Sequence, residues 1–363
     1  MHLPCLLGLF AIAACPSIPK SSPADRVVLV AGGGTGGDGG PAAQARLVEP
    51  FGVGCDAAGS LYIVEMQGGE RVRKVDPHGV ITTVVGTGEA GFSGDNGPAA
   101  QARINGAHHL LVLPDGDIFV ADTWNNRVRY VDHRTGIIST IAGTGEKGFS
   151  GDGEPAIKAR FGGIYCLALS PKRDRLYLCD LDNHRIRAID RETGIVTTVA
   201  GNGLQGIPED GQTATAAPLA DPRAIAVDSR GNLYILERNG NALRVVDSSG
   251  KIRTLIGPPN HDPPAEIGPL SGPKHLWVDR RDRVFIADTD NHRILMYDPR
   301  TARIRQIAGT GRSPGPNASP LAGIGGPAGK IDLNQPHGVF VRADGSVYIA
   351  DSMNGRVLRI QPF

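Results

Sequence analysis

The sequence predicts an all-β fold, a six-bladed β-propeller of four-stranded antiparallel blades. Six similar segments follow one another along the chain, about 50 to 63 residues apart, which suits one blade and its connecting loop. Within each segment, apolar and polar residues alternate with the period of two that strands produce. In addition, the residues before the first full segment match the part that the last segment lacks. The segments are anchored on Glu65, Asp122, Asp180, Glu237, Asp288 and Asp351.

The second segment illustrates the four strands that each blade should contain. Residues 109–113 and 118–121 are predicted as the first two strands, separated by the turn signal Pro114-Asp115-Gly116. A second turn at Trp124-Asn125-Asn126 leads to strands over 127–132 and 137–142. A glycine-rich connector over 143–161, nearly duplicated at 86–104, then leads to the next innermost strand.

The two ends of the chain predict how the ring closes. The sixth segment stops at Phe363 after its third strand, whereas residues 27–47 match a fourth strand plus connector with no blade before them. We therefore expect residues 27–31 to complete the sixth blade, which removes two unpaired sheet edges at once. The propeller should span residues 27–363.

Residues 1–15 have the features of an export signal. An apolar run from Leu6 to Ile12 ends in small residues and is too short to span a bilayer. The sequence Ile12-Ala13-Ala14-Cys15 resembles a bacterial lipobox, which implies lipidation of Cys15, and residues 16–26 would form a tether. No Lys or Arg precedes the apolar run, so a buried or disordered N-terminus of a cytosolic protein remains the alternative. The first interpretation predicts an exported protein that contacts a membrane only through its lipid.

Composition narrows the classes of partner. The 38 Lys and Arg residues nearly balance the 37 Asp and Glu residues, giving a net charge of +1. This balance argues against nucleic acid as a partner and requires any basic site to be local.

Cys55, Cys166 and Cys179 follow the signal segment. Cys166 and Cys179 lie opposite each other in one predicted hairpin. We favour two buried free thiols, because a disulfide between directly paired strands is strained. A disulfide between them remains the alternative.

The repeated motif identifies a family. Leu/Val-Tyr-Ile-Ala-Asp followed by Asn-x-Arg-Ile/Val, as in Val347–Asp351 and Asn354–Val357, resembles the NHL repeat. The connector Gly-Thr-Gly-x-x-Gly-Phe-Ser-Gly-Asp resembles those of secreted bacterial NHL-repeat proteins and of the teneurin NHL domain. The resemblance covers residues 27–363 and implies a β-propeller, but this fold hosts many functions.

The repeated acidic and arginine residues are predicted to have a structural role. An Asp five residues before an Arg recurs in several segments, where charge-assisted hydrogen bonds would fasten the hairpin between strands two and three. These pairs are Asp122 with Arg127, Asp180 with Arg185, Asp288 with Arg293 and Asp351 with Arg356. The connector residues Asp38, Asp95, Asp152 and Asp210 lack the alternating carboxylates of a calcium loop and are interpreted as turn residues.

Candidate binding residues are found where the six segments differ. Aligned starts of the innermost strands place Phe51, His108, Ile164, Arg223, Lys274 and His337 at one position, and Gly52, His109, Tyr165, Ala224, His275 and Gly338 at the next. If both positions surround the channel mouth, they form a cationic rim. The predicted binding residues are therefore His108, His109, Tyr165, Arg223, Lys274, His275 and His337.

A narrower resemblance concerns these strand starts. Gln335-Pro336-His337-Gly338 resembles the strand starts of peptidyl-hydroxyglycine amidating lyase, a six-bladed propeller. The resemblance implies zinc held by three histidines from alternate blades, with help from Arg and Tyr. His337 and His108 match two of them, but the third alternate blade offers Arg223, and His109 or His275 would have to substitute. Catalytic zinc normally needs three protein ligands.

These observations favour a non-enzymatic binding scaffold outside the cytoplasm that presents one propeller face to a protein or glycan. No cofactor is predicted, because no complete cofactor or metal motif is present in the sequence. The alternative is a metal-dependent lyase or hydrolase that uses His108, His337, Tyr165 and Arg223 at the channel mouth.

Overall fold

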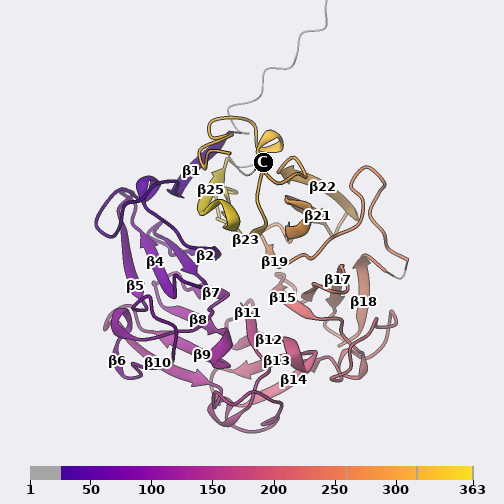
Figure 1. Ribbon diagram of the computed structural model, residues 1–363. Helices are drawn as coiled ribbons and strands as arrows, with labels where there is room; N and C mark the ends of the chain where they lie inside the picture. Colours follow the sequence, from indigo (N-terminus) through magenta and orange to yellow (C-terminus); the bar gives the residue numbers. More distant parts are fainter. Residues whose placement is uncertain (1–25, 259, 316–317, 362–363) are drawn as a thin grey trace, which may run out of the picture.

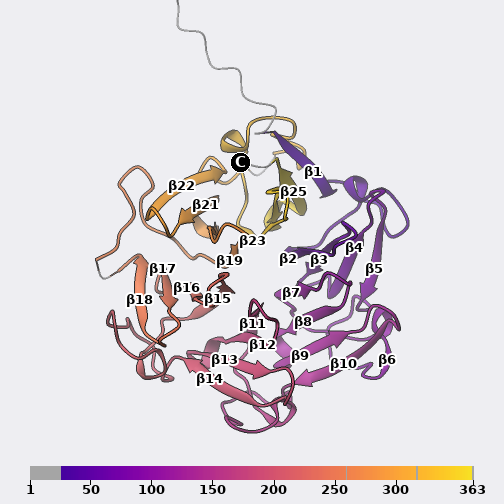
Figure 2. The ribbon, with the colours of Figure 1, turned by 180° about the vertical axis from the view of Figure 1, so that it is seen from behind.

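Six antiparallel sheets surround a central axis in the computed structural model, which describes residues 26–258, 260–315 and 318–361 (Figure 1). One strand of each sheet lies next to the axis, and the other strands follow outward. The view from behind shows the same ring, with the blades running in the opposite direction (Figure 2). The prediction of a six-bladed β-propeller is confirmed.

Every blade contains four strands in an up-and-down order. The first blade consists of β2 (Pro50–Cys55), β3 (Leu61–Glu65), β4 (Arg71–Val75) and β5 (Ile81–Val85). The second consists of β7 (His109–Val112), β8 (Ile118–Asp122), β9 (Arg127–Val131) and β10 (Ile137–Ala142), with the short β6 (Gly97–Pro98) at its outer edge. The third consists of β11 (Ile164–Leu169), β12 (Arg175–Asp180), β13 (Arg185–Asp190) and β14 (Val196–Ala200).

The remaining blades follow the same order. The fourth consists of β15 (Pro222–Val227), β16 (Leu233–Glu237), β17 (Ala242–Val246) and β18 (Ile252–Ile256). The fifth consists of β19 (His275–Val278), β20 (Val284–Asp288), β21 (Arg293–Asp298) and β22 (Arg303–Ala308). The sixth consists of β23 (Pro336–Val341), β24 (Val347–Asp351), β25 (Arg356–Ile360) and β1 (Val27–Gly32). In the second blade the strands match the predicted ranges to within one residue at each end.

Short 3-10 turns occupy two kinds of position. Five lie in the connectors between blades: η2 (Ala42–Gln44), η3 (Ala99–Gln101), η5 (Ala156–Lys158), η7 (Ala214–Ala216) and η9 (Ala328–Lys330). Four lie between the second and third strands of a blade: η4 (Thr123–Asn125), η6 (Leu181–Asn183), η8 (Thr289–Asn291) and η10 (Ser352–Asn354). The residue after each of these four is left-handed, with φ between 50° and 59° at Asn126, His184, His292 and Gly355. The Asn before each of these residues donates its side-chain amide to the Asp of its own blade at 2.8 to 2.9 Å, which explains the Asn of the Asn-x-Arg pattern.

The ring closes as the chain ends predicted. β1 pairs with β25 from Val27 opposite Ile360 to Gly32 opposite Arg356, so the first strand of the chain completes the last blade. The pairing leaves neither β1 nor the outer side of β25 as an unpaired strand edge. In addition, the Ser352 hydroxyl of η10 donates to the Pro50 carbonyl of the first blade at 2.6 Å, just as Thr123 donates to Ile164 between blades two and three. The contact between the last and first blades is therefore equivalent to an interior one.

The core lies between the faces of adjacent blades. Tyr62 and Val64 of β3 pack in one buried cluster with Leu110 and Val120 of the second blade. Since strand side chains alternate, each blade directs one apolar row to the blade before it and one to the blade after it.

Buried ion pairs fasten the strand hairpins, but the predicted pairing is correct in only two blades. Asp288 pairs with Arg293 and Asp351 with Arg356, each at 2.7 Å. In the second and third blades the buried carboxylate instead meets an arginine two residues further on: Asp122 with Arg129 and Asp180 with Arg187, both at 3.4 Å. The predicted partners Arg127 and Arg185 lie over Phe92 and Phe149 at 3.7 and 3.8 Å. The deeper arginine is available because β9 and β13 place it on the carboxylate side of the blade, where β21 and β25 have leucine.

Several connector aspartates also have a structural partner. Asp38, Asp95 and Asp152 accept from Arg73, Arg129 and Arg187 at 2.5, 2.8 and 2.7 Å. Each of these arginines therefore joins its own hairpin to the connector that precedes it. The interpretation of these aspartates as structural rather than calcium-binding residues agrees with these contacts.

Three further observations concern the N-terminus and the thiols. The signal segment, Cys15 and most of the tether lie outside the described residues. Within the described ranges, no helix is long and apolar enough to cross a membrane. Cys166 and Cys179 are buried and free, and Cys55 is free and half-buried, which agrees with the interpretation of unbridged thiols.

Candidate functional site

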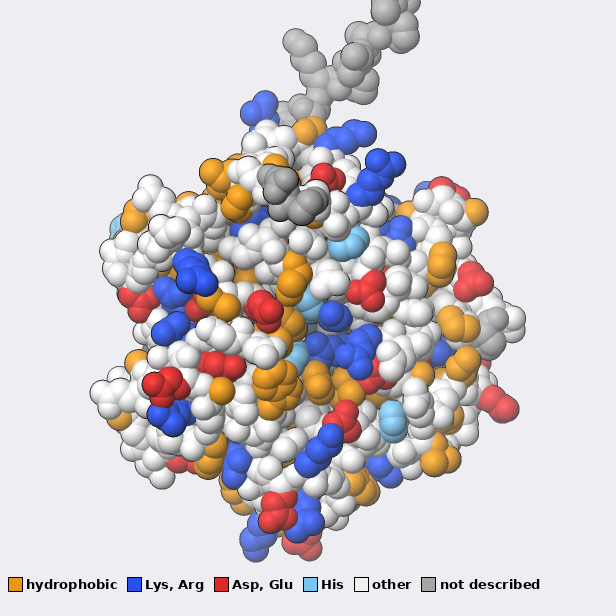
Figure 3. All heavy atoms as spheres, in the orientation of Figure 1, with side chains coloured by type: hydrophobic (Ala, Val, Ile, Leu, Met, Phe, Trp, Pro, Cys, Tyr) orange, Lys and Arg blue, Asp and Glu red, His pale blue; other side chains and the backbone are white. Residues whose placement is uncertain are grey.

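One end of the central channel is surrounded by six side chains, one from the start of each innermost strand. We call this set the mouth ring: Phe51, His108, Tyr165, Arg223, Lys274 and His337. Five of the seven predicted binding residues belong to it. Figure 3 views this face and shows histidine side chains and Lys or Arg side chains gathered at the centre of the ring.

The sequence alignment was wrong by one residue in the third blade. Leu167 pairs with Leu178 there, as Leu110 pairs with Val120 in the second blade, so Tyr165 corresponds to His108 and Cys166 to His109. Ile164, which was assigned to the rim, is fully buried in the interblade core. The error arose because Gly163 was matched with Ala107, whereas its structural counterpart is Gly106.

Contacts run around the mouth ring in order. The Phe51 ring stacks on His337 at 3.9 Å and meets His108 edge-on at 5.1 Å between ring centroids. His108 in turn contacts Tyr165 at 4.5 Å, and the guanidinium of Arg223 lies 4.1 Å from the Tyr165 ring centroid. At the other end of this series, Lys274 Nζ lies 2.8 Å from His337 Nε2.

The series of contacts is interrupted between Arg223 and Lys274, which are neighbours from the fourth and fifth blades. Two like charges are unfavourable side by side, and the pKa of Lys274 reflects this. Burial, followed by the charge of Arg223, lowers the pKa of Lys274 to about 8. Burial also lowers the pKa of Arg223 to about 10, so both side chains are cationic at neutral pH. The interruption is therefore a concentrated positive site.

Arg223 lacks partners for its charge. Its side chain is only 5% exposed, and its Nε and Nη1 have no hydrogen-bond partner. No carboxylate in the described part of the chain lies within ion-pair distance of it, and the nearby Asp221 is paired with Arg238 at 2.7 Å. A buried guanidinium without acceptors is costly, because water has been removed and only the Tyr165 ring faces the charge in its place. An acidic group arriving at the mouth would supply the missing acceptors in the fork geometry that arginine favours.

The mouth histidines do not form a metal site. His108 Nδ1 lies 2.7 Å from the Gly106 carbonyl and donates to it, which leaves Nε2 as an acceptor. His337 Nε2, however, accepts from Lys274. Phe51 also lies between the two rings. Burial holds the pKa of both histidines well below the usual range, so both are neutral. The two predicted zinc ligands thus do not converge.

His109 and His275 lie one layer deeper rather than at the mouth. They come from opposite blades, and their rings meet across the channel with centroids 4.7 Å apart. Cys166 joins them, with its Sγ 3.9 Å from His109 Nδ1. His109 and His275 are the first residues of β7 and β19, whereas the mouth residues His108 and Lys274 precede these strands. In β11 and β15 a register irregularity at the strand start redirects neighbouring side chains. We call His109, Cys166 and His275 the channel plug.

The channel plug brings three metal-ligand types within 4.8 Å of one another. The hydrogen bonds of the histidines nevertheless oppose metal binding. His109 Nδ1 accepts from the Leu167 backbone N–H at 3.2 Å, and His275 Nδ1 accepts from the Val339 N–H at 3.3 Å. In a neutral imidazole whose Nδ1 accepts, the proton is on Nε2, and a protonated nitrogen cannot ligate a metal. The Nε2 atoms of both histidines are buried without a partner.

The turns around the mouth carry the variable surface of this face. The central residue of η4 is Trp124, 43% exposed, and that of η10 is Met353, 42% exposed. The corresponding residues of η6 and η8 are Asp182 and Asp290. Trp124 packs over Gly106, where a Cβ would meet the indole, and its ring lies 6.1 Å from that of His108. The cationic centre is thus bordered by exposed apolar residues at η4 and η10 and by exposed aspartates at η6 and η8.

Sequence reasoning missed two members of the site. Phe51 was aligned at the first position but was not proposed as a binding residue, because an apolar side chain carries no charge signal. Cys166 was considered only with Cys179. Pairing the second strands before the first strands would have placed it beside His109, since the Leu-Tyr-Leu-Cys-Asp segment over 176–180 aligns without ambiguity.

The fold and its repeat define the class of protein, and comparison with known proteins agrees. A family model described as "Teneurin NHL domain" matches residues 29–91 and 156–272. The chain belongs to the NHL-repeat β-propeller family.

Two curated relatives show the range of proteins in which similar chains occur. The chain is 24% identical over 348 residues to NHL repeat-containing protein 2 of Bos taurus, covering 86% of this chain and 46% of the relative. It is 25% identical over 297 residues to Protein SUPPRESSOR OF QUENCHING 1, chloroplastic, of Arabidopsis thaliana, covering 76% of this chain and 27% of the relative. The chain therefore spans less than half the length of either relative.

Solved structures share the fold at lower identity. A Bacteroides thetaiotaomicron protein of unknown function superposes with a TM-score of 0.66 at 16% identity, covering 93% of this chain and 75% of that chain. An auxiliary nutrient binding protein from Bacteroides ovatus gives 0.62 at 16% identity, covering 93% and 76%. Virginiamycin B lyase from Staphylococcus aureus gives 0.52 at 14% identity, covering 87% and 96%. At these identities the likeness shows the fold alone.

Proposed function

We propose that the protein is a non-enzymatic binding scaffold that holds an acidic group of a protein or glycan partner at the mouth ring. The observation that carries this proposal is Arg223, a buried cation with unsatisfied N–H groups and no acidic partner. Lys274 on the adjacent blade doubles the positive charge at the same place. A carboxylate or sulfate seated between them would remove the repulsion between the two cations and satisfy the open donors.

The surroundings of the mouth suit a macromolecular partner. Trp124 and Met353 provide exposed apolar contact area beside the cations, and Trp, Met and Arg are enriched in binding interfaces. The rigid hairpins beneath them keep the site preorganised, which lowers the entropic cost of binding. We further propose that this face acts outside the cytoplasm, on the basis of the apolar segment and Cys15 in the sequence.

The proposal is tested by titration with two minimal probes, a disulfated disaccharide and a glutamate-rich hexapeptide. Trp124 reports binding through its fluorescence, and calorimetry gives the affinity. We expect Arg223→Met and Lys274→Met each to weaken binding of whichever probe binds by tenfold or more. The exposed residues Arg134 and Lys158 provide matched controls, and their Met variants should bind normally. Equal binding by all four variants, or no binding of either probe to the wild-type protein, would overturn the proposal.

The second candidate function is a metal-dependent lyase or hydrolase, favoured by the ligand types of the channel plug. It requires His109 and His275 to give up their backbone hydrogen bonds at Nδ1, or to bind metal as imidazolate. Elemental analysis of protein purified without added metal distinguishes the two functions. One equivalent of zinc, copper or iron, lost in His109→Gln, would favour the enzyme.

A further inference from the structure

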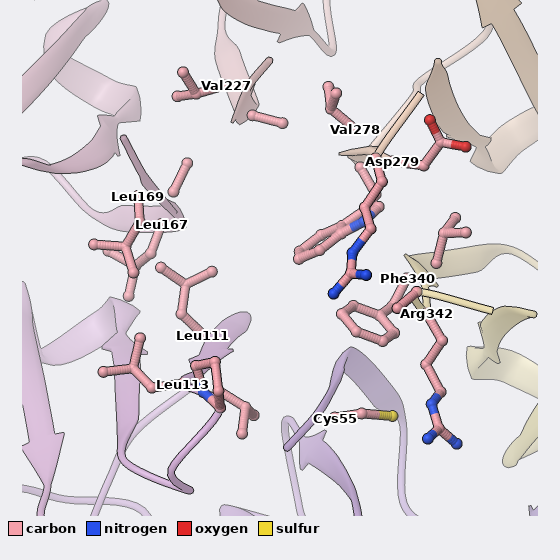
Figure 4. Close-up of a pocket in the computed structure, with 18 of the residues that line it drawn as sticks. Cys55, Leu111, Leu113, Leu167, Leu169, Val227, Val278, Asp279, Phe340 and Arg342 are labelled. Atoms are coloured by element: carbon pink, nitrogen blue, oxygen red, sulfur yellow. The ribbon is translucent and has the colours of Figure 1, made fainter. Parts of the chain in front are cut away.

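A cavity of about 530 Å³ opens at the end of the channel opposite the mouth ring. It is formed by the later residues of the innermost strands, after the two layers described above. Figure 4 looks into it and shows side chains from all six blades directed around one space. His109 of the channel plug forms its inner end, so the plug separates this cavity from the mouth.

The walls of the cavity are apolar. Leu111, Leu113, Leu167, Leu169, Val227 and Phe340 are among the side chains that line it (Figure 4). Trp277 lies in the same wall against Phe340, with ring centroids 4.6 Å apart, and remains half-buried. Apolar surface that is open to water in a concave site favours an apolar ligand, because its burial is the main source of binding energy.

The rim of the cavity carries a surplus of positive charge. Arg173, Arg280 and Arg342 line it together with two acids, Asp56 and Asp279. Asp279 is already paired with Arg283 at 2.6 Å, and Asp56 accepts from the Ser60 N–H and from the Tyr62 hydroxyl at 2.8 and 3.1 Å. Within the described ranges, none of the three rim arginines forms an ion pair. The donors to Asp56 are neutral and its carboxylate keeps its charge, but the three arginines outweigh it, so the net charge at the rim is positive.

The geometry points to a second ligand site, and we propose that this cavity binds a small amphipathic anion of the size of a medium-chain fatty acid. The apolar chain lies against the leucines, Trp277 and Phe340. The single anionic head stays at the wet rim, where the arginines neutralise it without the cost of burying a charge. This site is independent of the mouth ring, since the channel plug lies between them.

The two tryptophans of the sequence make the test specific. Trp124 borders the mouth and Trp277 lines the cavity. In a Trp124→Phe background, titration with dodecanoate below its micelle concentration should change the fluorescence of Trp277 saturably. Dodecanol, which has the same chain without the charge, should bind at least tenfold more weakly. A Trp277→Phe background should show no comparable change.

Two variants examine the wall and the rim separately. Leu169 is half-buried at the wall, so Leu169→Asp places a charge in the apolar space and should abolish dodecanoate binding. Arg280→Gln with Arg342→Gln should lower the dodecanoate affinity to that of dodecanol without changing dodecanol binding. Unchanged dodecanoate affinity in both variants, each checked for a native melting transition, would overturn the proposal. Arg223→Met should bind dodecanoate normally, so failure of the mouth proposal leaves this one standing.

Discussion

Lys274 Nζ lies 2.8 Å from His337 Nε2, so at the channel mouth an ammonium donates a hydrogen bond to a neutral imidazole. The histidine satisfies one of the three ammonium protons and adds no negative charge. Because burial and, second, the charge of Arg223 lower the pKa of Lys274, its proton is lost more easily than that of an exposed lysine.

This relationship predicts a pH dependence of anion binding. The pKa of Lys274 is about 8 in the folded protein without ligand, so its charge is largely lost by pH 9. The affinity for an acidic probe should fall about tenfold between pH 7 and pH 9, since only the protonated form attracts the anion. Calorimetry across this range checks the prediction, and Lys274→Met should flatten the profile. A profile that stays equally steep in this variant would contradict it.

The same pKa predicts an effect on folding stability. Between pH 8 and the ordinary lysine pKa of 10.5, the unfolded chain binds a proton at Lys274 that the folded chain does not. The contribution of this residue to the free energy of unfolding should therefore rise with pH in that window. Urea unfolding at several pH values shows the effect as a difference between the wild-type protein and Lys274→Met.

A buried and a half-buried arginine of the same hairpin should contribute differently to the free energy of unfolding. Arg129 is fully buried and forms the ion pair with the buried Asp122, so Arg129→Met leaves that carboxylate without its counter-charge and should cost about 3 kcal/mol of unfolding free energy. Arg127 is half-buried and lies over the Phe92 ring, so Arg127→Met should cost less than about 1 kcal/mol. Denaturant melts of the two variants measure both values. Equal losses would mean that the contact with Arg129 is not the stabilising one.

Removing β1 should destabilise the whole ring rather than one blade. Deleting residues 21–35 exposes the edge of β25 and removes the partner from Val357 to Ile360. We expect one cooperative transition at a markedly lower midpoint, because each blade packs on two neighbours. A truncation of residues 1–20, which ends before β1, is the control. An unchanged midpoint after the longer deletion would refute the closure model.

The hydrogen bonds of the channel plug predict that metal chelation does not change the thermal stability of the protein. If the Nε2 atoms of His109 and His275 carry protons, then EDTA and added zinc should each leave the melting midpoint unchanged. Thermal melts with and without each reagent provide the measurement. A zinc-dependent rise that disappears in His275→Gln would restore the metal interpretation.

The sequence by itself determined the ring. Its repeats predicted six blades, closure through β1, and the strand boundaries of the second blade to within about one residue. This was possible because apolar alternation and turn residues are local features that can be recognised in each segment separately. It also indicated that Arg223, Lys274 and His337 would gather at one mouth, since equivalent strand starts occupy equivalent places.

Only the tertiary structure decided what these side chains contact. A shift of one residue placed Tyr165, rather than Ile164, beside His108 in the mouth ring and brought Cys166 into the plug, and no local pattern reveals such a register error. Likewise, the choice between Arg127 and Arg129 as the partner of Asp122, and the proton positions on His109 and His275, depend on neighbouring strands. The mouth, the plug and the far cavity are therefore properties of the closed ring, because each is made by side chains from different blades.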